Sequence, residues 1–119
     1  MSKLAILTIA ERRRFDHPPV FNKEERRRQF LVPADVRLKL SHTRTHTNKV
    51  GFLLQFGYFR ATGRFFATEY FRRRDIDYVK KLFNLESVKL AQYSDRQARR
   101  HRQSICNLMN WRKIDAPQR

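Results

Sequence analysis

The stretch VGFLLQFGYF, residues 50–59, decides the fold. Its apolar residues follow one another with almost no polar interruption, which is the pattern of a helix buried on all sides. Gly51 and Gly57 would let neighbouring helices approach closely, at some cost in helix propensity. Gly63 is a natural stop after this segment. We therefore predict a central helix around which the rest of the chain packs.

Helix signals recur on both sides of this segment. The chain has only three Gly and four Pro, and so few breakers favour helices over a many-turned β fold. Capping pairs and apolar faces predict further helices over about residues 9–15, 23–31, 75–83, 86–92 and 94–109. Residues 33–40 are ambiguous: Pro33 can open a helix, but Val36, Leu38 and Leu40 alternate with polar residues as in a strand. Because this segment stands alone among helices, we expect residues 1–119 to form one all-α domain, a compact multi-helix bundle with helix-turn-helix-like character.

The strongest compositional signal is positive charge. Lys and Arg number 27 against 11 Asp and Glu, a formal net charge of +16, and 19 of the 27 are Arg. Arginine is favoured where a planar, multiply donating group must meet phosphate or a guanine edge. Nucleic acid is therefore the leading predicted partner, with an anionic membrane or an acidic protein as alternatives.

Several classes of protein and site fit the sequence poorly. Cys106 is the only cysteine, which excludes a disulfide within the chain and a thiolate zinc site and suits a reducing cytosol. No stretch approaches the roughly 20 apolar residues of a membrane span. The apolar run over residues 4–10 comes before the nearby arginines, whereas in a secretory signal peptide the positive charges come before the apolar run. His42 and His46 are four residues apart but have no third ligand nearby, so we expect no metal and no cofactor.

The stretch VGFLLQFGYFRATGRFF, residues 50–66, resembles a signature near the amino terminus of Tn-3 family transposases, which move class II replicative transposons. In that family the signature follows a polar stretch rich in Arg, His and Asn, as residues 44–49 do here. LTIAER at residues 7–12 is similar to the family's opening, and short matches continue in order between residues 77 and 105. The chain departs from the family pattern where residues 61–62 replace the usual Tyr-Pro and where Asn84 and Asn110 replace Gly.

The resemblance implies that the chain is the amino-terminal DNA-binding region of such a transposase, either a fragment or a truncated form. In the family this region helps to recognise the terminal inverted repeats, and an acidic-triad nuclease domain lies far downstream. Asp75 and Asp77 do not replace that triad, because residues two apart on a helix point to different sides. We interpret Asp75 as a helix-start residue and Asp77 as a surface charge, and we expect no catalysis by this chain.

The predicted final helix carries the clearest candidate DNA-reading face. Its apolar stripe includes His101, which we expect to be a hydrogen-bonded core residue, while Arg, Gln and Asn side chains that can contact base edges and phosphates lie opposite. The polar stretch before the central helix also suits phosphate binding. The predicted DNA-binding residues are Arg44, His46, Asn48, Lys49, Arg60, Arg64, Arg72, Arg73, Arg74, Arg96, Arg99, Arg100, Gln103 and Asn107.

The sequence thus predicts specific binding to double-stranded DNA at transposon ends, in the bacterial cytoplasm and associated with the nucleoid. We expect neither a small-molecule substrate nor a membrane partner. One alternative is an RNA-binding module, whose Phe residues would be exposed for stacking. Another is a regulatory fragment that pairs with full-length transposase, which would need an exposed apolar patch.

Overall fold

The computed structural model of the chain describes residues 17–115, with the side chains of residues 17–109. Within this range every regular element is helical. The elements are α2 (Lys23–Gln29), α3 (Ala34–Ser41), α4 (His46–Thr62), α5 (Arg73–Leu82) and α6 (Asp95–Asp115), with the short 3-10 helices η2 (Thr68–Tyr70) and η3 (Leu90–Gln92). The all-α prediction is confirmed. The helix predicted over residues 9–15 lies outside the described residues.

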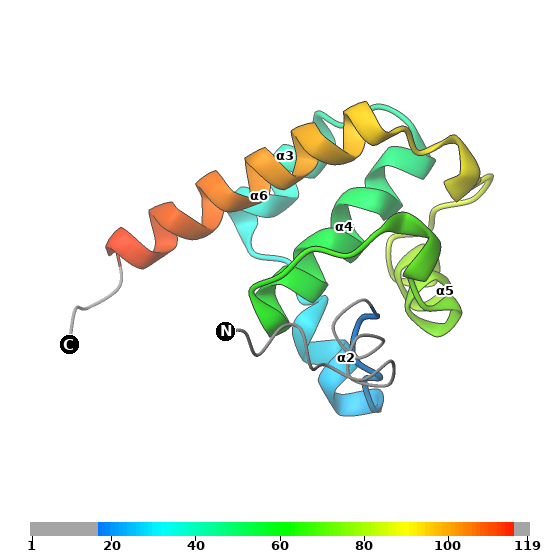
Figure 1. The fold of residues 1–119 in the computed structure, drawn as a ribbon, viewed down its shortest axis with the longest axis horizontal. Helices are drawn as coiled ribbons and strands as arrows, with labels where there is room; N and C mark the ends of the chain where they lie inside the picture. Colours follow the sequence, from blue (N-terminus) through cyan, green and yellow to red (C-terminus); the bar gives the residue numbers. More distant parts are fainter. Residues whose placement is uncertain (1–16, 116–119) are drawn as a thin grey trace, which may run out of the picture.

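Helix α4 is the centre of the molecule, as its sequence predicts. It packs against α2, α5, η3 and α6, and Figure 1 shows it in the middle of the fold with α6 above it and α2 below it. Residues 50–58 are all buried. The helix begins four residues before the apolar segment, where the Thr45 side chain accepts a hydrogen bond from the Asn48 N–H (3.0 Å). It ends at Gly63, which adopts the left-handed conformation with φ 76°.

The two glycines inside α4 are required by close contacts. A Cβ on Gly51 would lie 2.4 Å from Cζ of Tyr93, and a Cβ on Gly57 would lie 2.1 Å from Cε1 of Phe30. Both distances are far inside van der Waals contact. The glycines leave room for close packing, but the space is filled by an aromatic ring in each case and not by the approach of a neighbouring helix that the sequence predicts.

Helices α2 and α3 precede the central helix, and α3 decides the ambiguous segment at residues 33–40. Asn22 and Glu25 form the predicted capping box at the start of α2. The segment after Pro33 is a helix, in which Val36 and Leu40 are buried and Leu38 is 63% exposed. The alternation that resembled a strand therefore combines two core residues spaced four apart with one surface residue between them.

The carboxy-terminal half follows the predicted helices with one exception. Val79 of α5 is buried, and Asn84 after it is left-handed, with φ 56°. The helix predicted over residues 86–92 is wrong, because only η3 forms there and Ser87 is also left-handed, with φ 58°. Ser94 then accepts a hydrogen bond from the Gln97 N–H (3.1 Å) at the start of α6. Helix α6 continues beyond the predicted end at residue 109 and, in Figure 1, extends past the other helices.

Candidate nucleic-acid interface

A groove of about 900 Å³ lies where α6 passes the segment that leads into α4. It brings together the two stretches that the sequence singles out separately, the polar residues before the central helix and the first half of the final helix. Its lining consists of Lys39, His42, Thr43, Arg44, Thr45, Asn48, Gln97, Arg99, Arg100, His101, Gln103 and Ser104.

The groove is positively charged. Lys39, Arg44, Arg99 and Arg100 line it, and no Asp or Glu does. Within residues 17–109, none of these four side chains forms an ion pair with a carboxylate. A concave surface with cations of one sign concentrates the electrostatic field and attracts polyanions.

The outer face of α6 is arranged as predicted. Arg96, Arg100, Gln103 and Asn107 are all exposed, whereas the opposite side of the helix, which includes Ala98, His101 and Ile105, is buried. Arg100 and Gln103 also line the groove, while Arg96 and Asn107 lie outside its lining. Guanidinium and amide side chains therefore follow one exposed helix face from the groove outward.

A hydrogen-bonded chain lies beneath the groove. Gln55 of α4 donates through Nε2 to the Tyr93 hydroxyl (2.8 Å) and to the Ala98 carbonyl oxygen (3.2 Å). The Tyr93 hydroxyl lies 2.7 Å from Nδ1 of His101, whose ring meets Phe52 edge to face, with 5.2 Å between centroids. The prediction that His101 is a hydrogen-bonded core residue is confirmed.

Burial sets the protonation of this chain. Burial, reinforced by the positive charges of Lys39 and Arg100, lowers the pKa of His101 to about 4. Burial also raises the pKa of Tyr93. At neutral pH both groups are therefore uncharged, and His101 adds no charge of its own to the groove.

Two candidate residues near the groove are engaged with the protein backbone. His46 Nδ1 lies 2.7 Å from the carbonyl oxygen and 3.1 Å from the amide nitrogen of Glu86, so it holds the loop before η3 in either tautomer. Lys49 Nζ donates to the Leu40 carbonyl oxygen (2.9 Å) at the end of α3. Of the four predicted DNA-binding residues in the polar stretch, Arg44 and Asn48 line the groove, whereas His46 and Lys49 do not.

The candidates at the far end of α4 contact the protein too. Arg60 Nη1 donates to the Leu31 carbonyl oxygen (2.6 Å). The Arg64 guanidinium lies 5.1 Å from the ring centroid of Phe66, a distance suited to a cation–π contact. Neither residue lines the groove.

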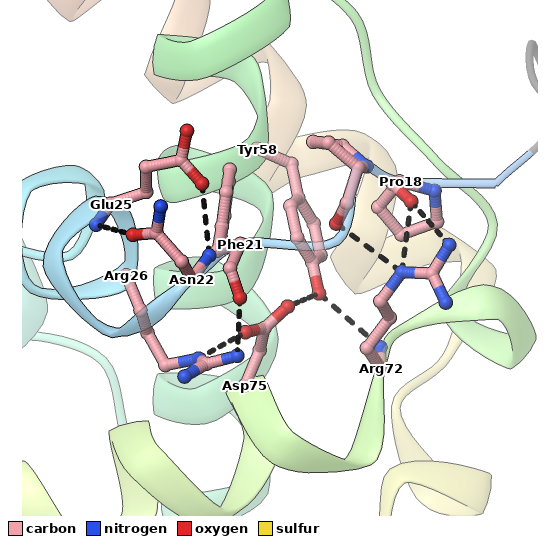
Figure 2. A network of polar contacts seen from close by, with 9 residues as sticks. Pro18, Phe21, Asn22, Glu25, Arg26, Tyr58, Arg72 and Asp75 are labelled. Carbon is pink, nitrogen blue, oxygen red and sulfur yellow. Dashed lines mark hydrogen bonds and ion pairs between the residues drawn. The ribbon is translucent and has the colours of Figure 1, made fainter.

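A buried polar network lies on a different part of the molecule, between α2, α4 and α5 (Figure 2). Asp75, at the start of α5, accepts hydrogen bonds from Arg26 Nε (2.7 Å) and from the Tyr58 hydroxyl. Arg26 also donates to the Phe21 carbonyl oxygen (2.9 Å). Burial and the hydrogen bond to Asp75 raise the pKa of Tyr58. The interpretation of Asp75 as a helix-start residue is thus incomplete, because its fully buried carboxylate joins three helices.

Arg72 belongs to the same network, and its guanidinium donates to backbone carbonyl oxygens. Its Nε and Nη2 donate to the Pro18 carbonyl oxygen (2.9 and 2.7 Å), and Nε also contacts that of Pro19 (3.2 Å). The two arginines that follow, Arg73 and Arg74, are exposed. Of this predicted cluster, Arg72 is partly exposed and bound to backbone carbonyl oxygens, whereas Arg73 and Arg74 are exposed.

The chain matches the model of a known protein family. The family model described as a domain of unknown function, DUF4158, matches residues 6–119. The chain belongs to the DUF4158 family. No curated protein and no solved structure matches it. The groove and the buried network both lie within the DUF4158 match.

Two further findings concern metals and membranes. In the described part of the DUF4158 domain, no three His, Cys, Asp or Glu side chains come close enough together to hold a metal ion. His42 lines the groove while His46 contacts the Glu86 backbone. Over the same residues, no helix combines the length and the apolar character needed to cross a membrane.

Proposed function

We propose that this DUF4158 domain binds duplex DNA through the groove between α6 and the start of α4. The groove's charge carries the proposal. Four Lys and Arg side chains converge there without a single acidic lining residue, in a chain with net charge +16. Phosphate contacts from such cations supply most of the affinity in DNA binding.

The neighbouring face of α6 supports a role in reading bases. Arg100 and Gln103 are exposed beside the groove. Arginine pairs with guanine and glutamine with adenine through two hydrogen bonds each in the major groove of B-DNA, which is wide enough to admit a helix. The major groove of duplex RNA is too deep and narrow for side chains to read in this way. We therefore favour DNA as the ligand, with α6 as the recognition helix of a helix-turn-helix-like arrangement.

The positions of the aromatic residues argue against single-stranded RNA. Phe52 and Phe56 are buried in the core. The large apolar side chains that are exposed among the described residues are Val20, Leu31, Leu38 and Leu82, none of them aromatic. Single-strand binders stack bases on exposed aromatic rings, so this surface suits a duplex better.

The biological target we propose is the terminal inverted repeat of a Tn-3-type transposon. This part of the proposal rests on the resemblance of residues 50–66, with the polar stretch before them, to the amino-terminal signature of Tn-3 family transposases. On this view the chain supplies DNA recognition during transposition, within the bacterial nucleoid, and full-length transposase is a second candidate partner.

The experiment is a binding titration with a fluorescent duplex at several salt concentrations. With about six phosphate contacts, the plot of log affinity against log salt has an expected slope near −5. A single-stranded RNA of equal length serves as the comparison ligand and is expected to bind more weakly. A flat salt dependence, or a preference for the RNA, would contradict the proposal.

A further inference from the structure

The Nε2 atom of His101 is an uncharged atom at the groove that is available for a hydrogen bond. His101 is 7% exposed and lines the groove. Its Nδ1 contacts the Tyr93 hydroxyl, whereas its Nε2 has no hydrogen-bond partner among residues 17–109. Among the described residues, Gln55 Oε1 is the one fully buried side-chain N or O atom without a hydrogen-bond partner. Because His101 Nε2 also has no partner but is not fully buried, it is accessible from the groove that His101 lines.

The hydrogen-bonded chain beneath the groove fixes which His101 nitrogen carries the proton. The Gln55 atom that faces the Ala98 carbonyl oxygen must be the NH2 group. The same NH2 group therefore donates to the Tyr93 oxygen. Nδ1 of His101, 2.7 Å from that oxygen, is then the acceptor within reach of the buried Tyr93 proton, so we assign the Tyr93 hydroxyl as the donor to Nδ1. A neutral imidazole that accepts at Nδ1 carries its proton at Nε2. The groove therefore contains a buried ring with one outward N–H donor.

The surroundings of this donor indicate what it binds. Lys39 from α3 and Arg100 from α6 lie close enough for their charges to act on the imidazole, and both line the groove. No acidic side chain lines it. An oxyanion is the acceptor that such a combination of one N–H donor and two cations favours.

We propose that His101 Nε2–H donates a hydrogen bond to a backbone phosphate oxygen of the bound duplex, beside Lys39 and Arg100. The inference rests on the proposed function and assigns a phosphate subsite within it. A phosphate contact fixes the position of the duplex without reading sequence. The chain from Gln55 through Tyr93 to His101 acts as a positioning device, because it sets the tautomer before DNA binds.

Two substitutions at one position separate the two ring nitrogens. In His101→Asn, the amide oxygen takes the place of Nδ1 and can accept from Tyr93, but the groove-facing donor is lost. In His101→Gln, the longer side chain places an NH2 group near the position of Nε2. We expect His101→Asn to weaken binding by about tenfold, the loss typical of a hydrogen bond to a charged group, and His101→Gln to keep most of the affinity.

The measurement is affinity at fixed salt for a terminal inverted repeat and for a random duplex, with melting temperature as the folding control. The assignment predicts that His101→Asn weakens both duplexes by the same factor. A folded His101→Asn variant that binds both duplexes as well as the original chain would overturn it. A loss confined to the inverted repeat would also overturn it, because that outcome indicates a base contact.

Nitrogen-15 NMR of the imidazole provides a second test, which needs no folded variant. Before DNA is added, we expect His101 to be neutral and protonated at Nε2 at pH 7. On titration with duplex, its Nε2–H resonance is expected to shift and its pKa to rise, because the phosphate adds negative charge beside the ring. Unchanged His101 resonances in the saturated complex would contradict the assignment. If the original chain binds no duplex, the proposed function fails; if Arg99→Ala weakens binding but His101→Asn does not, only this inference fails.

Discussion

The buried network around Asp75 and the groove beside α6 use the same residue type in opposite ways. In the network, Arg26 and Arg72 point inward and their N–H groups are directed at a carboxylate or at backbone carbonyl oxygens (Figure 2). In the groove, Arg99 and Arg100 are exposed and form no ion pair with a described carboxylate.

The difference shows that the number of arginines in a run does not measure its capacity to bind DNA. What matters is whether an oxygen of the protein lies within reach of the guanidinium. Arg26 and Arg72 hold segments distant in sequence together, so we expect removal of these contacts to lower the free energy of unfolding. Arg99 and Arg100 leave their donors available to an external anion, and the proposed cost of removing them is lost affinity.

Removal of the network's carboxylate is expected to give the largest effect on folding. Asp75→Ala would leave Arg26, whose side chain is only 14% exposed, without its charge partner. Breaking a buried pair typically costs about 3–5 kcal/mol. Asp77→Ala, two residues along the same helix but exposed, serves as the matched control and is expected to change the free energy of unfolding by less than about 0.5 kcal/mol. Urea denaturation measures both, and equal values for the two variants would contradict the structural role of the network.

Acid is expected to lower the free energy of unfolding through His101, which lines the groove. The pKa of His101 is about 4 in the folded chain and about 6.5 in an unfolded one. Between these values the unfolded chain binds a proton that the folded chain does not, so stability falls as pH falls. The expected loss from this residue between pH 7 and pH 5 is about 2 kcal/mol. Urea denaturation at both pH values, with His101→Asn as the comparison, should show a smaller pH dependence in the variant; equal dependences would contradict the assignment.

The two glycines of α4 extend the comparison to packing, because Gly57 lies against Phe30 on the network side and Gly51 against Tyr93 on the groove side. Alanine at either site forces a ring to move, at a typical cost of about 1–3 kcal/mol. We expect Gly57→Ala to lower stability with little effect on DNA affinity in the folded protein. Gly51→Ala should lower both, since a displaced Tyr93 no longer orients His101. Thermal melts and binding titrations on both variants test this, and identical binding losses would contradict it.

The smallest expected effect is a change in sequence preference. Arg100→Ala should reduce the ratio of affinities for an inverted repeat and a random duplex by about tenfold. The positive charge of Arg100 acts at the His101 subsite, but its guanidinium N–H groups are proposed to donate to a base edge. Arg73→Ala, which removes an exposed arginine outside the groove lining, should lower both affinities together. Competition binding at fixed salt measures the ratio. An unchanged ratio for Arg100→Ala would move the proposed base contacts to Gln103 and Asn107.

Local patterns in the sequence predict most of the helices and their buried faces, although they leave residues 33–40 ambiguous. The uninterrupted apolar run at residues 50–59, the turn at Gly63 and the exposed face of α6 are all properties of neighbouring residues, and the structure confirms each. The failure at residues 86–92 has a local cause, because Ser87 is left-handed and a left-handed residue interrupts an α-helix.

The site could be predicted only in part, because its composition depends on contacts between residues distant in sequence. Arg26 and Asp75 are 49 residues apart, and no local pattern indicates that they pair. The same holds for Lys49, which caps α3, and for Arg72, which binds the Pro18 carbonyl. Lys49 was predicted to face DNA from its place in the polar stretch before the central helix, and Arg72 from its place in a run of three arginines. The sequence identified Arg44 and Arg100 as candidates, but only the packing of α6 beside α4 brings them to one groove.

The central claim is that the groove, and not net charge, governs DNA binding. The most direct test compares two double variants that remove the same charge from adjacent arginines, Arg99→Ala/Arg100→Ala in the groove and Arg27→Ala/Arg28→Ala on α2, where both side chains are exposed. Duplex affinity at fixed salt is the measurement. The groove variant is expected to lose at least about tenfold more affinity than the α2 variant. Equal losses would show that the chain binds DNA through diffuse charge and would contradict the account.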